Sequence, residues 1–195
     1  MARTAARTRT TRETDITVNV NLDGTGISKI ETGIGFLDHM LEVLARHALL
    51  DLEVRAKGDT QVDFHHTVED IGLVLGTCLR EALGDRKGIR RYGFFLLPMD
   101  EALAEAVIDL GGRPFLSFAS NMKHAKAGDF EVKLLEEFFR ALSVEGRLNI
   151  HLRQITGDEA HHVCEAFVKA FARALRTAIE SDSRETGIPS SKGML

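Results

Sequence analysis

The chain has 195 residues, of which 44% are hydrophobic and 28% are charged, and its formal net charge is −4. Such a composition supports a substantial core, whereas the negative charge excludes a general nucleic-acid binder. No apolar run approaches the ~20 residues of a membrane span, so we expect neither a membrane nor a nucleic acid as a partner. The two cysteines, Cys78 and Cys164, form no disulfide framework, which favours a cytoplasmic protein.

The amino terminus reads MARTAARTRTTR, with four arginines, no acidic residue and no apolar face. We expect residues 1–12 to be a disordered tail. Apolar residues then alternate with polar ones, at Ile16, Val18, Val20 and Leu22. This period of two predicts a half-buried strand over 14–22, followed by a turn at Asp23-Gly24.

The next segment has helical spacing, with apolar residues at Leu37, Met40, Leu41 and Leu44. The alternation returns at Leu50, Leu52 and Val54, which predicts another strand. Residues 66–83 then carry a long helical pattern, and Gly84 suits its C-terminal cap.

A junction between two halves is expected in GDRKGIRRYG, residues 84–93. Beyond it, the patterns predict strands over 103–110 and 115–120, a helix over 131–144 and a long helix over 162–180. The second half thus repeats the order of elements in the first. This repetition indicates two α+β halves related by a pseudo-twofold axis.

One motif, two adjacent histidines followed by a glutamate, occurs in both halves. DFHHTVED begins at Asp63 and EAHHVCEA begins at Glu159, and the sequences on both sides of the two motifs align. We therefore predict an internally duplicated α+β domain, with halves at 13–88 and 89–187.

The spacing within each motif suits metal binding better than helix capping. On a helix, His65 and Glu69 share a face, whereas adjacent histidines point about 100° apart. A twofold arrangement then predicts two related metal sites. Their ligands are His65, Glu69 and His162 at one ion, and His161, Glu165 and His66 at the other. A lone motif of this kind would more simply be a polar helix start, but its duplication favours the metal.

The alignment of the halves also offers a fourth ligand for each ion. His39 aligns with Glu137, so His39 would complete the site of His161 and Glu137 the site of His65. Nitrogen and oxygen ligands without thiolates favour an octahedral transition metal such as Mn²⁺, Fe²⁺ or Zn²⁺. The ligand types do not distinguish among these metals.

Basic residues in three other segments suit a phosphate group. Arg86, Lys87, Arg90 and Arg91 lie in the junction, Arg113 lies in a Gly-Gly-Arg-Pro turn, and the chain ends in PSSKGML. Arginine forks, hydroxyls and lysine bind phosphate well. Taken one by one, these residues could equally form a solvated charged face.

Four long segments together resemble the imidazoleglycerol-phosphate dehydratase family of histidine biosynthesis. They are GIGFLDHMLEVLARH, DFHHTVEDIGLVLG, DEAHHVCEAFVKAFARALR and IPSSKG, and the likeness extends over residues 13–193. The resemblance implies a hydro-lyase that dehydrates D-erythro-imidazole glycerol phosphate to imidazole acetol phosphate and water. It also implies two ferredoxin-like halves (ribosomal-S5-domain-2-like), each a four-stranded sheet with two helices, and a shell of twenty-four subunits built from trimers.

The resemblance also assigns roles to residues. Two Mn²⁺ ions per active site would bind the imidazole or imidazolate ring, with metal ligands His39, His66, His161 and Glu165 at one ion and His65, Glu69, His162 and Glu137 at the other. A histidine usually stands where this chain has Glu137, and a glutamine usually stands where it has Val43. Catalytic roles fall on Glu13 and His47. The substrate-binding positions are Glu13, His39, His47, His65, Glu69, Arg91, Arg113, His161, Lys169, Ser190, Ser191 and Lys192, so residues 188–195 form a phosphate-binding tail.

Two other functions fit the same residues. A two-metal phosphatase would use the same ligands and basic groups but release inorganic phosphate. A shell held together by structural metals would fall apart on chelation and bind no phosphorylated small molecule.

Overall fold

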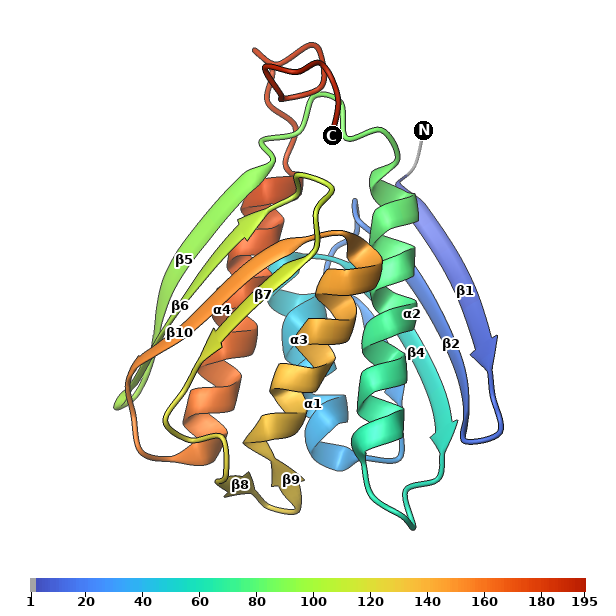
Figure 1. The fold of residues 1–195 in the computed structure, drawn as a ribbon, viewed down its shortest axis with the longest axis vertical. Helices are drawn as coiled ribbons and strands as arrows, with labels where there is room; N and C mark the ends of the chain where they lie inside the picture. Colours follow the sequence, from blue (N-terminus) through green and yellow to red (C-terminus); the bar gives the residue numbers. More distant parts are fainter. Residues whose placement is uncertain (1–2) are drawn as a thin grey trace.

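Two four-stranded sheets enclose four helices in the computed structural model, which describes residues 3–195 (Figure 1). The first half contains, in chain order, β1 (Thr4–Thr10), β2 (Thr14–Asn21), β3 (Ser28–Glu31), α1 (Gly35–Ala48), β4 (Asp51–Gly58) and α2 (His65–Leu83). Its sheet has the order β1-β2-β4-β3, in which β3 and β4 are parallel and the other pairs antiparallel.

The second half repeats this arrangement. It contains β5 (Tyr92–Met99), β6 (Ala102–Asp109), β7 (Phe115–Ala119), α3 (Val132–Gly146), β10 (Asn149–Thr156) and α4 (Ala160–Ile179). Its sheet has the order β5-β6-β10-β7, again with one parallel pair, and a small hairpin of β8 (Lys126–Ala127) and β9 (Phe130–Glu131) precedes α3. The predicted fold class, duplicated α+β halves with four strands and two helices each, is confirmed.

Each helix pair is formed by one helix from each half. Helix α2 lies along α3 and α1 along α4, while α2 covers the first sheet and α4 the second. Two glycines on α2 permit the close approach to α3. A Cβ at Gly72 would lie 2.6 Å from the carbonyl oxygen of Phe138, and one at Gly76 would lie 2.8 Å from that of Leu142. The core is therefore shared between the halves.

All four helices begin at the same end of the molecule, at the bottom of Figure 1, which we call the helix-start end. The junction 84–91 and the residues after α4 lie together at the opposite end, the tail end. Backbone hydrogen bonds join them, from Gly88 to Gly187 at 2.9 Å and from Asp182 to Gly88 at 2.8 Å. The histidine motifs and the C-terminal basic residues are thus at opposite ends of one chain.

The expectation of a disordered tail over residues 1–12 is wrong for 4–10, which form β1. This edge strand pairs with β2 along its whole length, from Thr4 opposite Asn21 to Thr10 opposite Asp15. It lacks the alternating apolar pattern because most of its side chains are exposed. Backbone pairing, rather than burial, holds it, so the first half begins before residue 13.

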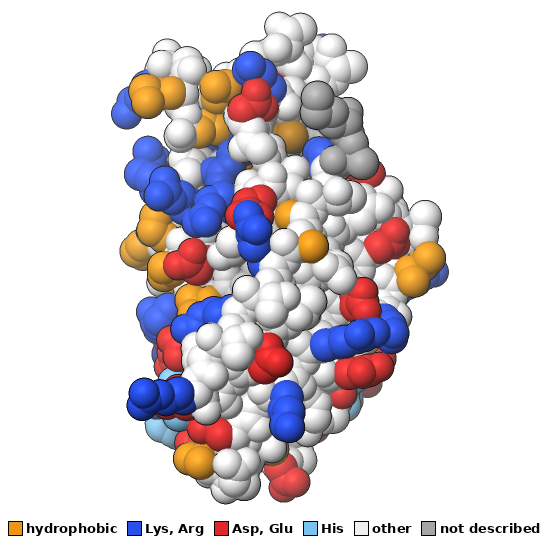
Figure 2. Space-filling model, turned by 90° about the vertical axis from the view of Figure 1, so that its right-hand side faces the viewer, with side chains coloured by type: hydrophobic (Ala, Val, Ile, Leu, Met, Phe, Trp, Pro, Cys, Tyr) orange, Lys and Arg blue, Asp and Glu red, His pale blue; other side chains and the backbone are white. Residues whose placement is uncertain are grey.

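The outer faces of the two sheets differ. On the second sheet, large hydrophobic side chains are exposed on β5, β6 and β7, namely Tyr92, Phe94, Leu96, Val107 and Phe115, of which Phe94 is 74% exposed. The first sheet turns its outer face to the viewer in Figure 2, where charged side chains of both signs are interspersed and hydrophobic ones are few. Within residues 3–195, no helix is both long and apolar enough to cross a membrane.

Candidate metal centre

Three predicted ligands come together at the helix-start end. His39 from α1 meets His161 and Glu165 from α4, and their ligand atoms lie within 4.8 Å of one another. Both histidine Nε2 atoms are 3.2 Å from Glu165 Oε2. We call these three residues the assembled cluster. It is the geometry expected of a metal site, because two imidazoles and a carboxylate converge on one point.

Neighbouring side chains hold the assembled cluster in place. Lys169, one turn after Glu165 on α4, contacts the second carboxylate oxygen at 2.5 Å. The ring of Phe36 packs edge-on against His161, with 5.2 Å between centroids. Burial alone would raise the pKa of Glu165, but the hydrogen bonds from Lys169 and His39 outweigh it and lower the pKa. Glu165 is therefore ionised at neutral pH and able to bind a cation.

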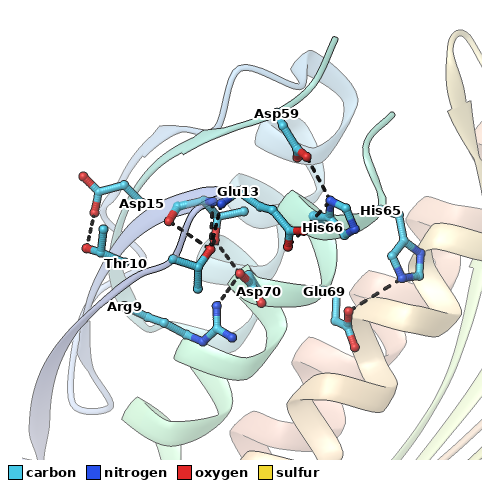
Figure 3. Close-up of polar contacts among 11 residues, drawn as sticks. Arg9, Thr10, Glu13, Asp15, Asp59, His65, His66, Glu69 and Asp70 are labelled. Carbon is cyan, nitrogen blue, oxygen red and sulfur yellow. Dashed lines mark hydrogen bonds and ion pairs between the residues drawn. The ribbon is translucent and has the colours of Figure 1, made fainter. Parts of the chain in front are cut away.

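The second predicted set is more open, and we call it the open cluster. His65 Nε2 lies 3.6 Å from Glu69 Oε2 on α2, and Figure 3 shows the two side chains pointing toward each other. His65 and Glu137 of α3 line one cavity of about 500 Å³. The carboxylate of Glu137 is drawn toward Arg140 at 3.6 Å. The ligands of this set share a cavity or a helix face, but within residues 3–195 they do not converge as the assembled cluster does.

His66 and His162 point away from both clusters and are held by carboxylates. His66 Nδ1 lies 3.0 Å from Asp59, whose hydrogen bond raises the pKa of His66 (Figure 3). His162 Nδ1 lies 2.7 Å from Glu101, with the same effect on the pKa of His162. A carboxylate on Nδ1 is the common support of a metal-binding imidazole. One chain alone does not bring either histidine into the cluster that the twofold argument assigned to it.

The two predicted catalytic residues lie in different surroundings. Glu13 occupies the turn between β1 and β2, where its carboxylate is 3.9 Å from His66 Nδ1 and its side chain is 57% exposed (Figure 3). His47 lies near the end of α1. Burial lowers the pKa of His47, and the nearby charges of Lys169 and Arg173 lower it further. His47 is therefore neutral at physiological pH.

The predicted phosphate-binding residues divide between the two ends. Arg91 bonds Asp109 through two nitrogens, at 2.7 and 3.1 Å, and donates to the Pro189 carbonyl at 2.7 Å. The tail residues Ser190, Ser191 and Lys192 follow directly. Arg113 is exposed in the turn before β7, and its neighbour Gly112 lies against the C-terminal Leu195. Lys169 stands apart from this group, beside the assembled cluster, where it contacts Glu165.

Not every basic residue of the junction is available for a phosphate. Arg86 is 6% exposed and donates to the carbonyls of Leu110 and Gly146, at 2.8 and 3.2 Å. It ties the junction to the second half and is structural. Lys87 and Arg90 pair with Asp85 and Glu180, at 3.0 and 3.4 Å, on the surface. Of the four, Arg91 alone extends toward the tail residues.

Asp59 and Glu101 are candidate site residues that the sequence patterns did not reveal. Each holds a motif histidine, yet Asp59 follows a strand and Glu101 lies in a hairpin turn, outside any recognisable motif. Their proximity to the histidines depends on how the sheets meet the helices. The duplication was the one available signal, because the turns that carry Glu13 and Glu101 are equivalent in the two halves.

Within one chain, the predicted metal ligands lie far from the predicted phosphate-binding residues of the tail end. His161 opens α4, whereas the Arg91 N–H bonds the carbonyl of Ala178 near the other end of that helix. Seventeen residues at 1.5 Å each place these points about 25 Å apart. A small phosphorylated molecule cannot span that distance, so the two groups of one chain cannot serve the same ligand.

Comparisons with known proteins show the family to which the chain is similar. The model of the family described as "Imidazoleglycerol-phosphate dehydratase" matches residues 32–175. Relatives of that name include one from Acidiphilium cryptum, 57% identical with all of both chains covered, and one from Acetivibrio thermocellus, 51% identical over 96% of each.

Two solved structures are also similar. The imidazoleglycerol-phosphate dehydratase of Staphylococcus aureus subsp. aureus N315 has a TM-score of 0.83 and 41% identity, with 92% of this chain and 99% of that chain covered. A Pyrococcus furiosus structure, solved in complex with (S)-C348, has a TM-score of 0.84 and 37% identity, with 97% and 100% covered.

Proposed function

The chain belongs to the imidazoleglycerol-phosphate dehydratase family, a family of hydro-lyases, and we propose that it dehydrates D-erythro-imidazole glycerol phosphate to imidazole acetol phosphate in histidine biosynthesis. One observation carries the proposal. The assembled cluster forms at three residues that the family resemblance assigns as metal ligands, in a chain that matches relatives over its full length. The two buried free cysteines suit a cytoplasmic enzyme.

The donor groups of both clusters fit a divalent transition metal, and we assign Mn²⁺ to them. Imidazole nitrogens and carboxylate oxygens suit Mn²⁺, and no thiolate is present to favour a softer ion. The assembled cluster offers His39, His161 and Glu165 to one ion. The open cluster offers His65, Glu69 and Glu137 to the other. When bound, two such ions would supply Lewis acidity at the ring nitrogens of an imidazole substrate and orient it.

The reaction removes a proton and a hydroxyl group from neighbouring carbons. Glu13 is the proposed acid/base, since its exposed carboxylate stands beside the helix that carries His65 and Glu69. It would take the proton from the middle carbon of the glycerol chain and give one to the hydroxyl that leaves the carbon attached to the ring. The enol that results would then tautomerise to the ketone. His47, kept neutral by burial, would contact the substrate as a hydrogen-bonding group rather than as a cation.

The substrate phosphate would bind to the tail-end group of another chain. Arg91, Arg113, Ser190, Ser191 and Lys192 are the proposed phosphate ligands. Because Arg91 is about 25 Å from the metal ligands of its own chain, a complete site needs more than one subunit. His66 and His162 would likewise act in another subunit, where they would complete the metal sites.

These features support assembly of several copies, and we propose the 24-subunit shell built from trimers that the family resemblance implies. The exposed hydrophobic side chains on β5, β6 and β7 supply an apolar surface larger than scattered single residues would give. The matching face of the first sheet is charged (Figure 2). The second sheet is therefore the better candidate for contacts between copies.

An assay of the purified, manganese-loaded protein with imidazole glycerol phosphate tests the function. It follows the ketone product and free phosphate together, with a chelator-treated control. We expect ketone without phosphate, abolished by chelation. Release of inorganic phosphate would favour the two-metal phosphatase, whereas bound metal without any reaction would favour the structural shell.

The role of Glu13 has its own test. Glu13→Gln keeps the size of the side chain and removes its proton-transfer capacity, so turnover should fall at least ~100-fold. Substrate binding, measured by calorimetry, should persist. Turnover equal to that of the wild type would remove Glu13 from the mechanism.

A further inference from the structure

The turn that carries Glu13 is tied to helix α2 by one buried carboxylate, Asp70. Asp70 Oδ2 accepts a hydrogen bond from the guanidinium of Arg9 on β1 (Figure 3). It also accepts one from the hydroxyl of Thr14 at the start of β2. Asp70 is 7% exposed. A single carboxylate therefore anchors both strands of the hairpin, one on each side of Glu13.

Hydrogen bonds within the turn connect the anchored residue Thr14 to the backbone of Glu13. The Thr11 hydroxyl accepts from the backbone N–H groups of Glu13 and Thr14, at 3.1 and 3.0 Å. The Thr11 N–H donates to the Thr14 carbonyl at 2.8 Å. Because Asp70 holds Thr14, the backbone of Glu13 is fixed relative to α2. Asp70 also lies four residues after His66, on the same face of that helix.

The second half shows that the fold does not require this carboxylate. The strand registers and the paired histidines identify equivalent positions in the two halves. Arg9, Thr14 and Asp70 correspond to Leu97, Ala102 and Ala166. These three apolar residues belong to the core or pack against it. Asp70 is buried and Arg9 is partly exposed. An ion pair that removes a carboxylate from water is often no more stabilising than packed apolar groups, so its presence in one half indicates a role other than stability.

The two turns also hold their glutamates differently. Glu101, the equivalent of Glu13, is fixed by its own carboxylate, which lies 2.7 Å from His162 Nδ1. The Glu13 carboxylate stays 3.9 Å from His66 and forms no hydrogen bond within residues 3–195, since Asp59 occupies His66 Nδ1 instead. Glu13 thus has a free carboxylate whose location depends on its backbone.

We propose that Asp70 is a positioning residue, which acts through Arg9 and Thr14 to place the Glu13 carboxylate for proton transfer. This inference rests on the proposed role of Glu13. Misplacement of a catalytic group by about 1 Å can cost ~100-fold in rate. Loss of the Asp70 charge should therefore lower kcat by about 10- to 100-fold, with KM and bound manganese close to those of the wild type.

The first comparison is Asp70→Asn against Glu81→Gln. Glu81 provides a matched control because it also joins β1 to α2, through Arg7 at 2.8 Å, but on the surface and away from the turn. Asp70→Asn should lower kcat with little change in KM, and Glu81→Gln should change neither. Equal kcat values for Asp70→Asn and the wild type would overturn the proposal.

A triple variant separates positioning from folding. Arg9→Leu, Thr14→Ala and Asp70→Ala together give the first half the apolar set that the second half already uses. We expect its thermal midpoint to stay near that of the wild type, because packed apolar groups replace the whole network. Its kcat should nevertheless fall about as far as in Asp70→Asn. A folded triple variant with wild-type kcat would contradict the inference.

A double-mutant cycle identifies the residue through which Asp70 acts. If Asp70 works by placing Glu13, then Asp70→Asn should cause no further loss in a Glu13→Gln background. A further loss of the same factor would show that Asp70 acts elsewhere. Wild-type turnover of Glu13→Gln alone would overturn the role of Glu13 as well, whereas a slow Glu13→Gln with a normal Asp70→Asn would overturn this inference only.

Discussion

The two halves of the chain carry the same ligand motif but hold it differently. Around α4, His39, His161 and Glu165 already converge, with their ligand atoms within 4.8 Å. Around α2, His65 lies 3.6 Å from Glu69 and lines a cavity of about 500 Å³ together with Glu137 of α3. The duplicated fold therefore gives one preformed cluster and one open cluster.

The residue one turn after the motif glutamate explains much of this difference. Lys169 follows Glu165 on α4 and contacts its carboxylate at 2.5 Å. The equivalent residue on α2 is Leu73, which offers Glu69 no cation. In the open cluster, Glu137 contacts Arg140 on its own helix at 3.6 Å. A duplicated backbone thus fixes where ligands lie, while single neighbours decide how firmly they are held.

Removing one histidine from each cluster should give the largest effect. His161→Ala and His65→Ala should each lower activity by more than ~100-fold, because loss of a supporting residue alone costs ~10- to 100-fold at metal sites. Manganese content after gel filtration should fall more in His161→Ala, since the assembled cluster is preorganised. A larger loss of metal from His65→Ala would reverse the comparison.

Adding a methyl group between α2 and α3, the helices that carry the open cluster, should destabilise the fold. A Cβ at Gly72 would lie 2.6 Å from the Phe138 carbonyl oxygen, and overpacking of this kind costs about 1–3 kcal/mol. Gly72→Ala should therefore lower the free energy of unfolding measured in denaturant. Gly35→Ala is the control, because no atom lies within 4 Å of a Cβ at Gly35. Equal stability of both variants would show that the helices can move apart.

Glu137 tests whether the open cluster binds metal as proposed. Glu137→Gln removes the charge and should weaken manganese binding at that site by about 10-fold, the lower end of what such changes cost. Glu137→His restores the ligand usual in the family and should bind at least as tightly as the wild type. Competition with a fluorescent chelator measures both. Unchanged affinity in Glu137→Gln would exclude Glu137 as a ligand.

The smallest effect is expected at the two cysteines, one in each half, which share a buried environment. Cys78 on α2 and Cys164 on α4 are both buried, and burial raises the pKa of each thiol from 9.0 to about 12. Because the raised pKa belongs to the folded state, the protonated thiols favour folding up to about pH 9, and stability declines as pH rises above it. Neither cysteine should react with iodoacetamide at pH 8 until the chain unfolds. Rapid labelling of one of them in native protein would indicate local opening of that half.

Local patterns in the sequence predicted most helices and the central strands correctly. Alternation over 14–22 corresponds to β2, and the helical patterns over 66–83 and 162–180 correspond to α2 and α4. The edge strand β1 escaped prediction because its side chains are largely exposed and show no apolar period. Strand β5 escaped too, since its outer face is itself hydrophobic and hides the alternation.

The sequence by itself determined the duplication, the paired histidine motifs and the residues within each motif that share a helix face. These follow from periods inside one element, which local geometry sets. The alignment of the halves offered His39 as a further ligand, but only the tertiary structure showed that it meets His161 and Glu165 within one chain, because that contact depends on how α1 packs on α4 across the two halves. It likewise placed Arg91 at the far end of α4, and joined Asp70 to the turn of Glu13, since such contacts depend on packing between elements distant in sequence.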